Sequence, residues 1–556
     1  MANLNDSRVG DILEQQQRMQ TQREHFEKVW QDIAERAAPR KAEFGRRNAA
    51  QTVKGKQRTE RMFDATPSLA LDRFASAFHS LVTPRNQQWH KLKAVDDELN
   101  DNTDVQRYLD DVNRRLFSAR YAANFDNQVH ECYYDAGAFG NMGLFIGERP
   151  GRGMLYRTVP IDQLFFAEND SGVVDLVHRY WWMPARAAYQ KWGDKLPPHI
   201  KHAAEKTPEA EFPFLHCVKP RTDLDVRRMD YRGMEFASYY VSVDGRAILD
   251  EGGFKVFPYA VGRYAVTSGE IYGRSPLMTV LPDVKMLNEI ERTTIQAAQL
   301  AVLPPILASR DGVLDAIRLT PAAINYGGVD EQGRQLIQPM KFGENLPVSI
   351  EMADQKRRTI QDALWNTLFQ ILIDNPTSMT ATEAMLRAQE KGALLAPTAS
   401  RTEAEFLNPM VARELQILED AGQLPPRPEA LQGAGFLEIE YTSPLERARR
   451  AEDGVAILRS VEQLAPLAQV LGPAAYKRVN VDAASKVIFE VNGVPAKVLY
   501  SDEEMAAIDE ENAAQAQLQQ VLQAAPVAAS AARDLAQAGA LAQGSPTQAA
   551  AVLPQV

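Results

Sequence analysis

Four short groups of residues in this chain could carry chemistry. His130-Glu131-Cys132 combines a base, an acid and a thiol, and Asp96-Asp97-Glu98 offers carboxylates to a metal ion. The neighbouring indoles of Trp181-Trp182 could stack on a base or a sugar. Gly55-Lys56 approaches the phosphate-binding pattern GxxxxGK[ST]. These groups represent acid–base, metal, stacking and phosphate chemistry in turn.

Each of the four groups has a simpler explanation. Adjacent residues on a helix point in different directions, which separates His130 from Cys132. A consecutive acidic run is typical of a solvated loop, and strand alternation turns one of the two indoles into a core. At Gly55-Lys56 the magnesium-binding hydroxyl is replaced by Gln57 and the first glycine by Ala50. The sequence has no HExxH, GxSxG or GxGxxG motif either, so we predict no enzyme, no cofactor and no metal site.

The composition is that of a folded protein with several domains. The 556 residues are 45% apolar and 24% charged, enough for about three or four domain-sized units. No apolar run is long enough to span a membrane, and the polar start MANLNDSRVG is unlike a signal peptide. Cys132 and Cys217 are far apart and lack a CxxC spacing, which predicts buried or idle thiols.

The charge is unevenly distributed along the chain. The formal net charge is −11, yet residues 36–61 carry a net +7 and residues 501–556 a net −6. An acidic total argues against tight wrapping of DNA, which needs clustered cations, but it does not exclude DNA passing nearby. The basic segment is either a solvated arm, which we favour, or a contact for nucleic acid or an acidic partner.

The elements that must position any site begin with three helices and continue with strands. Apolar spacing predicts helices over residues 11–38, 66–83 and 104–120, the second capped by Thr66 and Pro67, all before any strand. From Gly143 the period changes to that of β-strands, with turns at Asp170-Ser171-Gly172 and Asp244-Gly245. The fold class expected is α+β and mainly helical.

The stretch GEIYGRSPL, residues 269–277, predicts the start of an unusually long helix. Ser275 is a good N-cap and Pro276 suits the first turn. Helical spacing of apolar residues continues to the Pro304-Pro305 stop, a run of roughly 43 Å at 1.5 Å per residue, which Pro282 could bend or delay. A small α/β insert, 304–348, precedes a second long helix, which we expect to be capped by Ser349 and to reach residue 373.

The remainder of the chain is predicted to be helical. Thr380 and Glu383 have capping-box spacing, and a helix over 400–421 should be kinked by Pro409 and closed by Gly422. Ala- and Leu-rich helical segments continue to about Lys497. The Ala/Gln-rich end is either a loosely packed helix or disordered.

Several long blocks, in a consistent order over roughly residues 60–425, resemble the portal, or head-to-tail connecting, proteins of short-tailed bacteriophages. The blocks are MFDATPSLALDRFASAFHSLVTP with WHKL, VPIDQLFFAENDSGVVDLVHRYWW, GRYAVTSGEIYGRSPLMTVLPDVKMLN and MTATEAMLRAQEKGALLAPTASRTEAEFLNPMVARELQIL. The resemblance implies a ring of about twelve subunits at one capsid vertex, through which double-stranded DNA is packaged and ejected.

The resemblance also implies a division of the chain. The regions are a wing (1–274), a first stem helix (275–303), a clip (304–348), a second stem helix (349–373), a channel loop with a kinked wing helix (374–430), a helical crown (431–505) and a tail that is a barrel helix or disordered (506–556). An acidic lumen would repel phosphates, while sparse cations such as Arg387 and Lys391 could touch the DNA backbone without reading sequence. Equally, these two cations could pair with Glu383 and Glu390 on an exposed helix face.

The implied partners are further copies of the chain, DNA, the major capsid and scaffolding proteins, a tail adaptor and a terminase that supplies ATP hydrolysis at the clip. No membrane is implied. The implied location is the virion, with host cytoplasm during assembly. Two alternatives stay open: a non-portal tail or scaffold component, which would assemble around a tail tube, and a DNA-processing enzyme, which would need a metal-binding carboxylate cluster.

Overall fold

The computed structural model describes residues 7–443 except 42–43, 45–61, 101, 150, 152, 303–305, 309–331, 333–336, 340–345, 367–394 and 432–436, with scattered positions after residue 443. Helices and several sheets occur together, which confirms a mixed helix and strand fold. The chain divides into two compact units, 1–462 and 463–556. Almost all described elements belong to the first unit.

The three helices predicted over residues 11–38, 66–83 and 104–120 form with corrections at their edges, and two further helices, Asp97–Asn100 and Phe125–Phe139, form where none was predicted. Their bounds are α1 (Ser7–Arg36), α2 (Thr66–Val82), α3 (Asp97–Asn100), α4 (Thr103–Ala122) and α5 (Phe125–Phe139). Thr66 is not a cap, because it is already helical and its N–H donates to the Asp64 carboxylate at 2.6 Å. The expectation of three helices before any strand is wrong, since β1 (His90–Ala94) precedes α4.

Two antiparallel sheets follow. The three-stranded sheet has the order β3-β2-β9, from β2 (Asn141–Arg149), β3 (Gly153–Thr158) and β9 (Tyr259–Arg263). The five-stranded sheet has the order β4-β5-β6-β7-β8, from β4 (Leu164–Glu168), β5 (Val174–Pro184), β6 (Glu211–Pro220), β7 (Phe236–Ser242) and β8 (Ala247–Phe254). The two predicted turns join β4 to β5 and β7 to β8 as hairpins.

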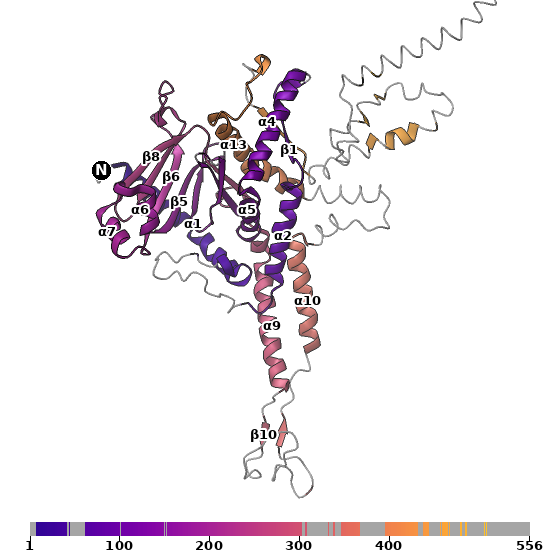
Figure 1. Cartoon of the computed structure of the whole chain (residues 1–556). Coiled ribbons are helices and arrows are strands. Elements are labelled where there is room, and N and C mark those ends of the chain that lie inside the picture. The colour runs from indigo at the N-terminus through magenta and orange to yellow at the C-terminus, as the bar shows by residue number, and fades with distance from the viewer. Residues whose placement is uncertain are drawn as a thin grey trace, which may run out of the picture. The chain divides into compact units, whose positions relative to one another are not determined.

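Helices cover both faces of the five-stranded sheet, because β6 and β7 alternate apolar residues to both sides. Val9 and Ile12 of α1 pack with Leu215 and Cys217 on one face. On the other face Phe214 packs against α6 (Ala185–Trp192) and α7 (Pro198–Lys206), which lie beside the sheet in Figure 1. Burial raises the pKa of Cys217 to about 12 and that of Cys132 further, so both thiols are buried and protonated, as predicted.

The predicted long helix is divided in two. It forms α8 (Pro276–Thr279) and α9 (Leu281–Val302), separated at Val280. Pro282 explains the break, since it has no N–H to bond the Met278 carbonyl four residues earlier. The second long helix, α10 (Leu346–Ala363), begins three residues before Ser349, so Ser349 is not its cap. Pro347 lies in the first turn, where a missing N–H costs nothing.

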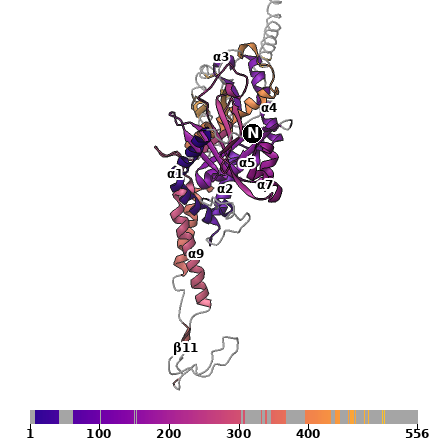
Figure 2. The same cartoon turned by 90° about the vertical axis from the view of Figure 1, so that its left-hand side faces the viewer.

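Helices α9 and α10 pack side by side, as Figures 1 and 2 show. The segment that joins them includes an antiparallel pair of short strands, β10 (Ile306–Ala308) and β11 (Ile337–Pro339). The helix–insert–helix order expected from the sequence is therefore present. The remaining residues of the insert, like residues 367–373 at the predicted end of the second helix, lie outside the described residues.

The last described strand of the first unit pairs with the first strand, β1. A π-helical segment (Glu403–Leu407) leads into α13 (Asn408–Asp420), and Pro409 stands in the first turn of α13. Gly422 follows with a φ of 64°, a conformation that favours glycine after a helix. Strand β12 (Leu437–Tyr441) then pairs with β1, so segments far apart in sequence form one ladder.

Candidate functional site at the root of the paired helices

The paired helices leave the rest of the first unit at the start of α8. We call the residues that close this point the root: Gly140, Asn141, Arg263, Gly273 and Ser275. The Ser275 side chain accepts a hydrogen bond from the Met278 N–H at 3.0 Å, and Pro276 is the first helical residue. These are the predicted cap and start. Ser275 is buried, and its hydroxyl also donates to the Ala138 carbonyl of α5 at 2.9 Å. One side chain thus caps a helix and attaches it to another.

Two backbone segments cross at this root with no space between them. A Cβ on Gly273 would lie 2.3 Å from the Gly140 carbonyl oxygen, and a Cβ on Gly140 would lie 2.5 Å from the Arg274 carbonyl carbon. Gly140 also has a φ of 76°, where it ends α5. Gly273 is therefore required for close approach, whereas Gly140 is required for both space and conformation.

Asn141 holds the crossing segments together. Its side-chain amide oxygen accepts from the Gly273 N–H at 2.7 Å, while its Nδ2 donates to the Phe139 carbonyl at 2.9 Å and to the Gly273 carbonyl at 3.3 Å. Because Asn141 is fully buried, these bonds satisfy polar atoms that water cannot reach. The root is closed by hydrogen bonds as well as by packing.

Arg263, at the end of β9, connects the root to two acidic side chains from elsewhere. Its Nε donates to Glu405 Oε2 at 2.9 Å, and its Nη1 forms an ion pair with Glu168. Nη1 also donates to the Ile271 carbonyl at 3.2 Å. Burial disfavours the cation, but the hydrogen bonds that it donates to Glu405 and Glu168 outweigh this and raise the pKa of Arg263. Glu405 belongs to the π-helical segment, which this pairing ties to the root.

The end of α10 also contacts the root, through Trp365 and Tyr264. Trp365 follows the last turn of α10 with a φ of 58°, which is uncommon for a bulky side chain. Its indole Nε1 donates to the Tyr264 hydroxyl at 2.7 Å, and the Tyr264 N–H donates to the Gly140 carbonyl at 2.9 Å. The exit from α10 is thus attached, through Tyr264, to Gly140, the residue that the entry to α8 crosses.

Charged side chains join α9 and α10 near their root. Lys356 of α10 lies 2.7 Å from Asp283 of α9, and Arg357 pairs with both Glu291 of α9 and Asp64. Burial disfavours the Asp64 carboxylate, but the hydrogen bonds from Thr66 and Arg357 prevail and lower its pKa. The two helices are fixed to each other and to the segment before α2.

Farther from the root the same helices expose large apolar side chains. Val284 and Leu287 of α9 are buried, but Ile295 is 44% exposed and Val302 is 79% exposed. On α10 the apolar residues near its start are exposed in the same way; they are Val348, Ile350 and Met352. Because the helices run antiparallel, the end of α9 and the start of α10 present these side chains at the same end of the pair. We call this the distal apolar surface: Ile295, Leu300, Val302, Val348, Ile350 and Met352.

The other residues predicted from the sequence do not form a second site within the described residues. Arg387 and Lys391, with the capping pair Thr380 and Glu383, lie outside the described residues. The kink at Pro409 stays a prediction; the observed irregularity is the π-helical segment just before it. His130 lies 3.2 Å from the Ser76 hydroxyl, while the neighbouring thiol of Cys132 is buried, so these two do not converge.

The part of the chain that the structure describes contains no candidate metal site and no candidate membrane span. No three His, Cys, Asp or Glu side chains there are grouped to hold a metal ion. None of the described helices combines the length and the apolar character needed to cross a bilayer.

Three residues of the root were not found from the sequence: Gly140, Asn141 and Arg263. A signal for the first existed, because a glycine after the apolar run of α5, followed by β-spacing, is typical of a helix end. No local pattern indicates Asn141 or Arg263, because their partners are distant in sequence.

The chain belongs to the bacteriophage head to tail connecting protein family, whose family model matches residues 9–499. It is 27% identical over 533 residues to the portal protein of Salmonella phage epsilon15, covering 95% of both chains. It is 26% identical over 510 residues to the probable portal protein of Bordetella phage BPP-1, covering 90% of both. The match confirms the resemblance seen in the sequence blocks and favours the connector over the alternatives.

Proposed function

We propose that this connector protein is the subunit of a ring of about twelve copies at one capsid vertex, with double-stranded DNA passing through its centre. The observation that carries the proposal is the distal apolar surface on the paired helices. Large apolar side chains exposed at one end of a helix pair favour a partner that covers them, and a ring supplies each subunit with a neighbour on both sides.

We infer the division of the chain from the resemblance to portal proteins, and the paired helices support its central part. We assign residues 1–274 to the wing, 275–303 and 349–373 to the stem, and 304–348 to the clip between the stem helices. Residues 374–430 provide the channel loop and the wing helix that carries Pro409, residues 431–505 the crown, and 506–556 the tail. The order of α9, the insert with β10 and β11, and α10 supports the stem and clip assignments.

DNA passes without sequence readout. An acidic ring repels phosphates at short range, and an isolated cation contributes only a weak, salt-screened attraction. Arg387 and Lys391 are the cations proposed to touch the backbone, because they lie in the segment assigned to the channel loop.

The partners are proteins of the head and tail, and the chain has no catalysis or cofactor of its own. The wing meets major capsid and scaffolding proteins, and the clip receives terminase during packaging and tail adaptors afterwards. The protein works in the virion after assembly in the host cytoplasm. The assignment rests on the family and on the portal proteins to which the chain is similar.

Mass photometry and electron microscopy of the purified full chain test the ring. We expect closed rings with a central hole, in which the subunits can be counted down the axis. A chain that stays monomeric or dimeric at micromolar concentration, or that forms open filaments, would contradict the proposal.

A further inference from the structure

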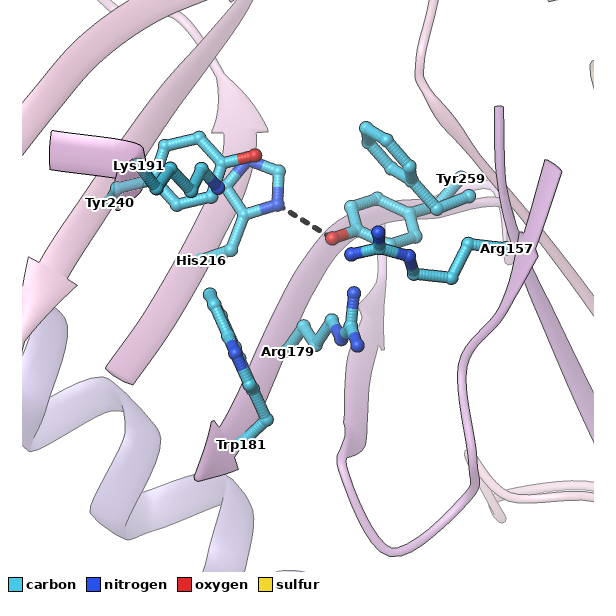
Figure 3. A pocket seen from close by; sticks show the side chains of 8 residues that line it. Arg157, Arg179, Trp181, Lys191, His216, Tyr240 and Tyr259 are labelled. Carbon is cyan, nitrogen blue, oxygen red and sulfur yellow. Dashed lines mark hydrogen bonds between the residues drawn. The ribbon is translucent and has the colours of Figure 1, made fainter. Parts of the chain in front are cut away.

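A pocket lies where the five-stranded sheet meets the three-stranded sheet (Figure 3). Its lining comes from β2, β3, β5, β6, β7, β9 and α6; the residues are Phe145, Arg157, Arg179, Trp181, Lys191, His216, Tyr240 and Tyr259. Its cavity volume is about 30 Å³, room for roughly two water molecules. The pocket therefore suits a small ligand or a single group of a larger one.

Three of the lining residues are cations, and none is a carboxylate. Arg157 and Lys191 are exposed at the mouth, and Arg179 is half-buried. Within the described residues none of the three forms an ion pair; Arg179 Nη2 only reaches Gln163 Oε1 at 3.4 Å, and its Nε is buried without a partner. Figure 3 shows the two guanidinium groups reaching toward the Tyr259 hydroxyl from different strands.

The three cations are close enough to repel one another. Nearby carboxylates compensate their charges poorly. Burial, followed by the charges of Arg157 and Arg179, lowers the pKa of Lys191 to about 8. Asp250 opposes this shift, but its carboxylate already pairs with Lys195 at 2.8 Å. In a chain whose net charge is −11, a local excess of three positive charges needs an explanation.

Aromatic rings fix the positions of these cations and leave the floor without a negative charge. Lys191 Nζ lies 3.8 Å from the centre of the Tyr240 ring, and the Arg179 guanidinium lies 5.0 Å from the Trp181 ring. At the floor, His216 stacks on Tyr240 and lies 2.6 Å from the Tyr259 hydroxyl. Burial, with the charges of Lys191 and Arg179, lowers the pKa of His216 and keeps it neutral.

We propose that this pocket binds one phosphate group, supplied by inorganic phosphate, a nucleotide or the terminal phosphate of a nucleic acid. A phosphate monoester carries about −1.5 to −2 charge and three acceptor oxygens, which matches three cations better than a carboxylate does. Two guanidinium groups and an ammonium provide the forked and single donors that such an anion binds. The inference does not depend on the proposed ring, since all eight lining residues come from one chain.

Isothermal titration of the purified full chain with inorganic phosphate tests the site directly. We expect saturable binding of one phosphate per chain, and weaker binding of acetate. Parallel titrations with a mononucleotide and with duplexes that carry or lack a terminal phosphate distinguish the sources. Preference for the phosphorylated duplex identifies a nucleic-acid end, and binding of the mononucleotide or phosphate alone identifies a small ligand. Absence of saturable phosphate binding overturns the proposal.

Variants at two lining cations, compared with a control on the same helix as Lys191, separate the site from general electrostatics. Lys191→Gln and Arg157→Gln should each weaken phosphate binding by on the order of tenfold, as expected for loss of a charged donor. Arg186→Gln removes the same charge from α6 at an exposed position whose partner is Glu209, 3.7 Å away, and should leave the affinity unchanged within about twofold. Circular dichroism checks that each variant is folded. Equal weakening by Arg186→Gln would show that no specific site exists.

Discussion

The root of the paired helices and their distal apolar surface belong to the same elements but are built in opposite ways. At the root, glycines let backbones touch, every polar atom of Asn141 is used, and Arg263 is paired with carboxylates. At the distal surface, large apolar side chains such as Ile295 and Val302 face solvent.

The difference indicates which contacts one chain completes and which it leaves to others. A root closed within the chain sets the direction of α9 and α10 before any partner binds. Exposed apolar surface lowers the free energy only when a neighbour covers it. Changes at the root should therefore reduce the folding stability of the single chain, and changes at the distal surface should reduce assembly. The following predictions, ordered by their effect on folding stability, test this division.

The largest loss is expected from Gly273→Val. Its Cβ would overlap the Gly140 carbonyl, and neither segment can move away without breaking the Asn141 hydrogen bonds. We expect the free energy of unfolding to fall by more than about 4 kcal/mol in urea titrations. Gly252→Val is the control, because a Cβ at this strand position meets nothing within 4 Å. Similar stability of both variants would show that the crossing can relax.

Arg263→Met should lower the free energy of unfolding somewhat less than Gly273→Val does. It leaves Glu405 and Glu168 without their shared cation, and removing one member of a buried pair costs about 3–5 kcal/mol, a figure reduced here because both carboxylates are partly exposed. Arg401→Met removes a different cation from the same Glu405 at a more exposed position and should cost less than about 1 kcal/mol. Equal costs, measured by thermal unfolding, would contradict a special role for Arg263.

Ser275→Ala removes both the helix cap and the bond to Ala138. The expected loss of stability is about 1–2 kcal/mol, the usual range for a cap. Thr293→Ala on α9 is a suitable control, because its exposed hydroxyl bonds only to carbonyls of its own helix. A change below about 0.5 kcal/mol for Ser275→Ala would show that Pro276 alone starts the helix.

The smallest effect on stability, with the largest on assembly, is expected from Ile295→Asp. An exposed substitution changes the unfolding free energy by no more than about 0.5 kcal/mol, yet a charge here should prevent neighbours from packing. Mass photometry should then show monomers where the unmodified chain forms rings. Gln296→Asp introduces the same charge beside it and should assemble normally. Rings formed by Ile295→Asp would remove the distal surface from the interface.

What the sequence predicted depends on how local the cause is. Ser275 and Pro276 act within one helical turn, and strand alternation repeats every two residues, so both were recognised. The break at Val280 follows from Pro282, also a local cause, and was anticipated as a bend or delay. The predicted start of α10 is wrong because Ser349 is taken as the cap, whereas the helix already begins at Leu346 and Pro347 lies in its first turn.

The parts that were missed have distant causes. Strand β1 is short and becomes a strand by pairing with β12, and Asn141 matters because Gly273 reaches it. The pocket between the five-stranded and three-stranded sheets could not be predicted for the same reason. Arg157, Arg179 and Lys191 are ordinary surface cations until the fold brings three elements together. Periodicity along the chain contains no information about such encounters.

The β1–β12 ladder also has a consequence for how the protein is made. Its outer pair joins His90 to Tyr441, so it closes a loop that contains every described element of the first unit between these residues and leaves only α1, α2 and the 3₁₀ turn at Pro39–Lys41 before it. Contacts between such distant residues form late, because the loop entropy must be overcome first. During synthesis the edge of β1 has no partner until Tyr441 has left the ribosome, long after α4 and α5 are complete. Strand β1 therefore gains its partner only when β12 has been made. A chain truncated before residue 437 would present the unpaired edge of β1 to neighbouring chains.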